Sequence, residues 1–193
     1  QQWAVTPDVS ALGTARGSGV AGCSRGGVGD LMRLGGLDRD RGRVFLLSNT
    51  GGGGTHAIAA ARATGSEVVE RDVPKHLREV GQRLMDGLNG MASELGVAGS
   101  VSAYGFACSP YLAFNDREGK PSPGLRTLFL QEMAAAGVLI PYIAPSFPHT
   151  EAEVDLTVDA ADGAFRAVAN VPAGQPPEGR CAGPAAHPRR PRH

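Results

Sequence analysis

The chain has 193 residues, enough for one or two modest domains with a buried core. Its 19 basic and 19 acidic residues cancel, which gives no electrostatic reason to expect a nucleic acid or a membrane surface as partner. Cys23, Cys108 and Cys181 are far apart and lack CxxC spacing, so they indicate neither a disulfide framework nor a zinc site. We therefore expect a protein of the reducing cytoplasm, without metal.

Short elements broken by glycine are predicted over the first 50 residues. We expect strands at residues 9–12, 20–24 and 44–47, and a brief helix at residues 30–34. The stretch FLLSNTGGGGTHAIAAA then passes from the third strand through four glycines into a helix, which we expect to run from an N-cap at Thr55 to Glu70.

The glycine turn within this stretch admits two interpretations. Backbone N–H groups in such a turn at a helix N-terminus form an anion site, and Thr50 and Thr55 would add hydroxyl donors for a phosphate. Alternatively the glycines supply only positive φ to a structural strand-to-helix connection. A P-loop is excluded, because no lysine precedes the final hydroxyl.

The pattern is stronger from Pro74 to Phe165. Apolar residues spaced by three and four predict a long amphipathic helix that Gly96 ends. Two strands, a second helix, a strand-like apolar run broken by proline and a third helix follow. Thr150 and Glu153 form a capping box for that third helix. We expect these elements at residues 74–95, 100–107, 110–115, 125–136, 138–145 and 150–168. Helices on one face of a small sheet make an α+β layout.

Composition changes abruptly after Val171 to a segment rich in proline and arginine. We predict that residues 172–193 form a disordered tail, because they contain too little apolar surface to bury. A solvated appendage is one interpretation and contact with an acidic partner is another. The change in composition also suits a shifted reading frame.

Three segments together resemble the C-terminal half of the class III aminotransferases, which are fold type I pyridoxal-phosphate enzymes, and in particular the glutamate-1-semialdehyde 2,1-aminomutase-like branch. The segments are VTPDVSALGTARGSGVAGCS with DLMRLGGL, RVFLLSNTGGGGTHAIAAA, and RTLFLQEMAAAGVLIPYIAPSFPHTEAEVDLTVDA. The resemblance implies an α/β fold in which residues 1–60 end the large cofactor-binding domain and residues 61–171 form the small C-terminal α+β domain. It also implies homodimers that use pyridoxal phosphate on an amino-acid or semialdehyde substrate.

The resemblance assigns roles to individual positions. A threonine like Thr50 reaches the cofactor phosphate of the neighbouring subunit, and Gly51 would allow close backbone approach to that anion. Thr14 occupies the position of the Schiff-base lysine, whose amine must bind the cofactor aldehyde. The only lysines are Lys75 and Lys120, which we expect in a surface helix and a polar turn.

We therefore expect a truncated or degenerate aminotransferase-like protein that is inactive alone and binds the cofactor weakly at most. The family's ring-stacking aromatic residue and its aspartate for the ring nitrogen precede the segment matched by this chain. A non-catalytic dimerisation partner of a full-length homologue is the alternative. A damaged gene product without selected function is a third hypothesis.

Other polar and aromatic residues have simpler interpretations. We expect helix capping or solvent exposure rather than catalysis for His56 and His149. Asp8 and Asp30 are expected in turns or caps, and Ser10 is expected to support no hydrolase chemistry.

For Arg126 we expect an exposed position on its helix rather than a site for a substrate carboxylate. The aromatic residues Tyr104, Tyr111 and Phe114 are expected in a core or interface.

Overall fold

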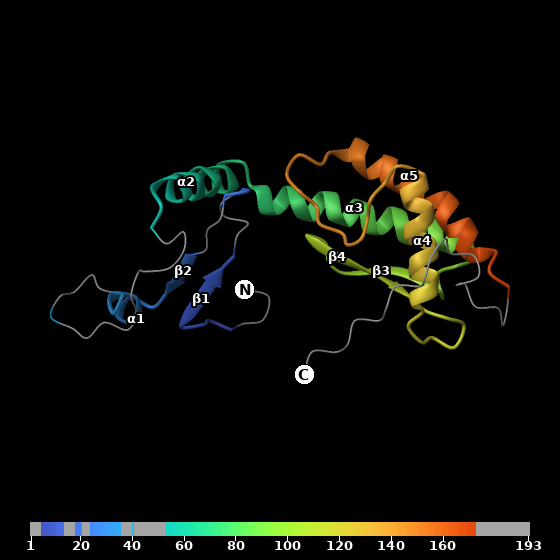
Figure 1. The fold of residues 1–193 in the computed structure, drawn as a ribbon, viewed down its shortest axis with the longest axis horizontal. Helices are drawn as coiled ribbons and strands as arrows, with labels where there is room; N and C mark the ends of the chain where they lie inside the picture. Colours follow the sequence, from blue (N-terminus) through green and yellow to red (C-terminus); the bar gives the residue numbers. More distant parts are fainter. Residues whose placement is uncertain (1–4, 14–17, 21–23, 36–39, 41–52, 173–193) are drawn as a thin grey trace. The chain divides into compact units, whose positions relative to one another are not determined.

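The computed structural model describes residues 5–13, 18–20, 24–35, 40 and 53–172. It contains two compact units, Gln1–Asp72 and Val73–His193 (Figure 1). The predicted end of the large domain at residue 60 remains a prediction. The strand expected at residues 44–47 and the tail from residue 173 lie outside the described residues.

Unit 1 (Gln1–Asp72) holds a two-stranded antiparallel sheet and two helices. Strand β1 (Val9–Leu12) pairs with β2 (Ser24–Gly27), which begins where the strand expected at residues 20–24 was predicted to end. Residues 21–23 of that expected strand lie outside the described residues, and Gly27 lies against the Asp8 carbonyl oxygen too closely for any Cβ. Helix α1 (Gly29–Arg33) follows as expected.

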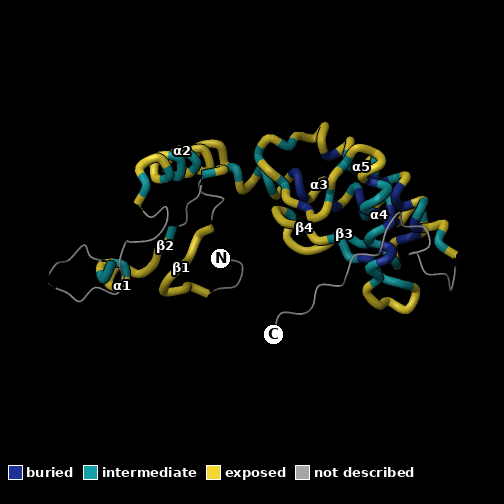
Figure 2. Tube along the Cα trace, in the orientation of Figure 1, coloured by how far each residue is buried: buried dark blue, intermediate teal, exposed yellow. Residues whose placement is uncertain are grey.

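Helix α2 (Thr55–Glu70) has the predicted bounds but not the predicted cap. Gly54 is the N-cap residue, and Thr55 is the first residue inside the helix, without a side-chain capping bond. None of the described residues of unit 1 is buried, and Figure 2 shows them in teal and yellow. Ile58 is 52% exposed and Val69 is 80% exposed. The apolar side chains of α2 therefore find no core within the described part of this unit.

Unit 2 (Val73–His193) is built on the long helix α3 (Val73–Glu94), which confirms the predicted periodicity by burying Val80, Leu84 and Leu88. Gly96 ends the helix in the left-handed region at φ 70°, and the Val97 N–H donates back to the Ala92 carbonyl at 2.8 Å.

A β-hairpin and two helices complete this unit. Strand β3 (Val101–Phe106) pairs antiparallel with β4 (Ser109–Phe114), close to the predicted bounds. Helix α4 (Pro123–Ala135) begins at an N-cap serine, and α5 (Glu151–Ala169) begins with the predicted capping box. Helix α5 packs on both α3 and α4, while the hairpin packs mainly on α3 (Figure 1). This is the expected α+β layout.

The core of unit 2 is centred on three phenylalanines. Phe129 and Phe165 are fully buried with ring centroids 5.5 Å apart, and Phe114 of the hairpin lies 5.1 Å from Phe129. One aromatic column thus joins the hairpin, α4 and α5, which fixes these elements in a single hydrophobic core.

The strand predicted at residues 138–145 is wrong. This segment is irregular, with Ile143 buried but Leu139 84% exposed and Tyr142 73% exposed. Pro141 and Pro145 have no backbone N–H to donate to a sheet, and the Val138 N–H instead donates to the Met133 carbonyl at the end of α4. The helices in the described part of the chain include none with the length and apolar character of a membrane span.

Candidate functional site

The residues predicted to meet the cofactor, Thr14, Thr50 and Gly51, lie outside the described residues. Of the glycine turn, the structure describes Gly53, at φ 73°, and Gly54, the N-cap of α2. Gly53 therefore uses the left-handed conformation that favours glycine, as the structural interpretation of the turn requires.

Both lysines of the sequence lie in the described part of the chain, so the surroundings of each lysine side-chain amine are known. The Lys75 amine lies 3.8 Å from Glu79, and its side chain is 64% exposed. The Lys120 amine lies 2.7 Å from Glu118, and its side chain is 72% exposed. Neither lysine lines either of the two cavities described below. These amines do not fit the aldehyde of pyridoxal phosphate, which needs a lysine held against the bound ring.

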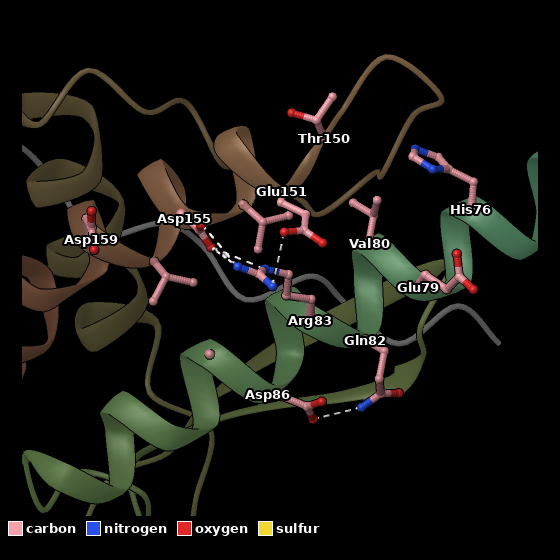
Figure 3. Close-up of a pocket in the computed structure, with 13 residues that line it drawn as sticks. His76, Glu79, Val80, Gln82, Arg83, Asp86, Thr150, Glu151, Asp155 and Asp159 are labelled. Atoms are coloured by element: carbon pink, nitrogen blue, oxygen red, sulfur yellow. Dashed lines mark hydrogen bonds and ion pairs between the residues drawn. The ribbon is translucent and has the colours of Figure 1, made fainter.

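A groove of about 920 Å³ lies between α3 and the first half of α5 (Figure 3). Its floor includes the apolar side chains of Val80, Val154 and Val158. Gly87 lets the two helices approach, since a Cβ there would lie 2.7 Å from a Val158 methyl. Of the described residues, five carboxylates and one guanidinium line the groove, so this lining is acidic. The carboxylates belong to Glu79, Asp86, Glu151, Asp155 and Asp159.

Among the described residues, Arg83 is the only arginine that lines this groove, and two carboxylates of α5 contact its guanidinium. Its guanidinium donates to both Asp155 oxygens, at 2.8 and 3.1 Å, and lies 3.5 Å from Glu151 (Figure 3). The hydrogen bond with Asp155 and then the charges of Asp155 and Glu151 raise the pKa of Arg83. Arg83 is thus an inter-helix tie and not a free cation for a substrate carboxylate.

The described histidines of unit 2, His76 and His149, hold the segment that enters α5. His76 Nε2 donates to the His149 carbonyl at 2.9 Å, and the His76 ring meets Phe147 edge to face at 5.1 Å. His149 Nδ1 accepts the Ser146 N–H at 3.0 Å and lies 3.2 Å from the Ser146 hydroxyl. Because Nδ1 already accepts a backbone proton, it is poorly placed to activate this hydroxyl. His56 is exposed in the first turn of α2.

Arg126 is half-buried, contrary to the exposed position expected from the sequence. Its Nη2 donates to the Pro141 carbonyl at 2.8 Å, and so it holds the irregular segment after α4. A second cavity of about 530 Å³ runs along that segment and α5.

Of the aromatic residues expected in a core or interface, Phe114 is in the core. Tyr104 and Tyr111 are 51% and 58% exposed, with their ring centroids 5.3 Å apart across the hairpin, so an interface role stays a prediction for them. The aspartates have local roles: the Asp8 carbonyl accepts from Val28, and Asp30 lies in the first turn of α1. Ser10 is exposed in β1, and no cluster of potential metal ligands occurs among the described residues.

Sequence reasoning missed the Arg83–Asp155 tie and the Ser146–His149 pair. The Arg83–Asp155 contact joins residues that are 72 positions apart, so no local sequence pattern predicts it. The second is local, and its signal is a serine three residues before a histidine that precedes the Thr150 cap.

No protein-family model matches the chain. The glutamate-1-semialdehyde 2,1-aminomutase of Desulfatibacillum aliphaticivorans is 30% identical over 175 residues, covering 85% of this chain and 40% of that protein. The aminomutase of Syntrophobacter fumaroxidans is also 30% identical over 175 residues, covering 83% of this chain and 39% of that protein.

Solved structures, among them a transaminase, share the fold. The FumI protein of Sphingopyxis sp. MTA144, in its PLP internal aldimine form, aligns with a TM-score of 0.72 and 24% identity over 88% of this chain and 39% of that one. An omega-transaminase from Sphaerobacter thermophilus aligns with a TM-score of 0.70 and 21% identity over 84% of this chain and 39% of that one. The chain spans about 40% of the length of these relatives, and over most of its own length it is similar to the C-terminal half of the class III aminotransferases.

Proposed function

We propose that this chain is a degenerate aminotransferase or aminomutase-like protein that does not catalyse amino transfer by itself. The observation that carries the proposal is the state of its two lysines, which are both exposed, paired with glutamates and outside the cavities. The family resemblance supports it further, because Thr14 occupies the position at which intact relatives have the Schiff-base lysine. A threonine hydroxyl cannot replace that amine.

By the same resemblance, intact relatives move an amino group on an amino-acid or semialdehyde substrate with pyridoxal phosphate. When bound, that cofactor supplies the electron sink for chemistry at the substrate Cα. Because the lysines do not fit its aldehyde, this chain is proposed to bind it weakly and without a covalent bond. Thr50 and Gly51 remain the proposed phosphate contacts across a dimer interface, in the cytoplasm.

The test is an absorbance titration of the purified chain with pyridoxal phosphate, followed by borohydride reduction and peptide mapping. We expect no stoichiometric adduct on either lysine. Lys75→Arg and Lys120→Arg variants serve as controls, because each keeps the positive charge and removes one amine. A one-to-one adduct that is lost in one of these variants would show a rebuilt aldimine site and overturn the proposal.

A second candidate function is that of a dimerisation partner for a full-length homologue or a second copy. The specific observation behind it is the exposure of Ile58 and Val69 on α2, in a unit whose described residues bury no side chain. Apolar helix surface left without a core is typical of an interface. Light scattering of the purified chain, alone and mixed with a complete relative, tests this candidate, and a monomer under both conditions would exclude it.

A further inference from the structure

The charges of this neutral chain are unevenly distributed along its sequence. Residues 173–193 contain four arginines against one glutamate, so the preceding residues carry a matching negative excess. Three of those arginines lie within residues 188–193, PRRPRH. Residues 73–172, by contrast, contain eleven carboxylates and seven basic side chains, and five of the carboxylates line the groove between α3 and α5.

Part of this groove charge is uncompensated. Glu151 and Asp155 are paired with Arg83, and Glu79 lies 3.8 Å from Lys75. Asp86 accepts only a neutral amide bond, from Gln82 at 2.8 Å, and Asp159 has no ion pair among the described residues (Figure 3).

The groove also has an apolar floor. Val80 and Val154 are buried in it, and Val158 lies between the helices opposite Gly87. A segment that combines guanidinium groups with proline rings matches both features, since arginine pairs with carboxylates through two parallel hydrogen bonds.

We propose that the groove between α3 and α5 binds the arginine-rich residues 188–193 of the same chain. The connection is long enough: about 16 residues separate Pro172 from Arg189, and such a length spans up to roughly 50 Å. Asp155 lies on the same helix about 15 residues before Asn170, which is roughly 22 Å along the axis. In this arrangement Arg189, Arg190 and Arg192 meet the carboxylates at the rim, and the prolines lie over Val158, which is the partly exposed valine of the floor. The inference is independent of cofactor binding.

Paramagnetic relaxation enhancement on the full chain tests this contact. Cys181 lies before the arginines and accepts a nitroxide label once Cys23→Ser and Cys108→Ser remove the other thiols. We expect label-dependent broadening of amide signals at residues 79–87 and 151–159. It should weaken when salt is raised from about 0.1 M to about 1 M, since the Debye length falls from about 10 Å to about 3 Å.

Two variants and one control make the outcome decisive. We expect the triple variant Arg189→Ala, Arg190→Ala, Arg192→Ala to lose the broadening, and Asp86→Asn with Asp159→Asn to weaken it. Glu94→Gln, which removes a carboxylate of α3 outside the groove, should keep it.

Three results would overturn the proposal: no broadening at the groove, broadening centred instead on the exposed tyrosines of the hairpin, or equal broadening in the Glu94 and groove variants. The claim that the contact is intramolecular is tested with a mixture of two kinds of chain. One kind carries the nitroxide but no nitrogen-15, and the other carries nitrogen-15 but no nitroxide. Groove broadening that is as strong in this mixture places the contact between molecules and likewise overturns the proposal.

Discussion

The side chain of Asn89 on α3 pairs with the backbone of Ala103 on β3 through two hydrogen bonds. Its Nδ2 donates to the Ala103 carbonyl at 2.9 Å, and its Oδ1 accepts the Ala103 N–H at 2.8 Å. The amide thereby satisfies the two groups of Ala103 that point away from β4. The Asn89 side chain thus bonds to the outer edge of β3 as the backbone of a neighbouring strand would, and so it joins α3 to the hairpin.

We predict that Asn89→Leu destabilises unit 2 by about 2–3 kcal/mol, because it leaves a buried donor and a buried acceptor without partners. Urea unfolding measures the change. Ser93→Ala is the control, since the Ser93 hydroxyl donates to the Asn89 carbonyl on the exposed side of the helix, and we expect it to stay within about 0.5 kcal/mol of the unmodified chain. Equal losses in the two variants would contradict the role given to Asn89.

Gly81 and Gly90 on α3 give opposite predictions for the same substitution. A Cβ at Gly81 would overlap the Ala107 carbonyl oxygen, a backbone atom that cannot move aside, whereas a Cβ at Gly90 meets nothing within 4 Å. We expect Gly90→Ala to stabilise the helix by up to about 1 kcal/mol. Gly81→Ala should lower the midpoint of thermal unfolding or prevent folding. Similar midpoints for both variants would show that the close approach is not maintained in solution.

The capping box of α5 predicts a pH dependence. Hydrogen bonds from the Thr150 side chain and then its backbone lower the pKa of Glu153 below its usual value of about 4.3. The folded state therefore binds a proton less readily than the unfolded state. This stabilisation is present above the unfolded pKa and is lost as pH falls through the folded pKa.

The variant Glu153→Gln isolates this contribution, because glutamine keeps an acceptor but does not titrate. We expect the unmodified chain to be more stable than the variant at pH 7, and the difference to disappear in acid below the folded pKa. Unfolding free energies measured from pH 7 downward check this, and a difference that stays constant with pH would refute it. Thr150→Ala should cost about 1 kcal/mol at pH 7 through loss of the cap.

Phe129 is predicted to be the costliest single truncation in the core. It is fully buried between Phe114 and Phe165, so Phe129→Ala should cost about 3–5 kcal/mol and remove most of the cooperative unfolding transition. Leu156→Ala, at a side chain 61% exposed on α5, is the control and should change stability by less than about 0.5 kcal/mol.

The elements of unit 2 were predictable where local chemistry decides them. The three-and-four spacing of α3, its stop at Gly96 and the Thr150 capping box all appear in the structure as expected. Residues 138–145 were predicted wrongly because an apolar run resembles a strand, although Pro141 and Pro145 cannot donate to one. The groove was not predictable, because the Arg83–Asp155 tie depends on how α3 and α5 pack. The predicted cofactor positions remain predictions.

Because none of the described residues of α2 is buried, this helix is expected to unfold locally more readily than the helices of unit 2. A 16-residue helix without tertiary burial is only marginally stable in water, whereas α3 is anchored by six buried residues. In native-state hydrogen exchange, α2 amides should exchange through local fraying, at rates insensitive to the Phe129→Ala substitution. The amides of α3 facing the core should open only with the whole of unit 2. If α2 were instead protected as strongly as α3, a partner covering Ile58 and Val69 would have to supply that protection.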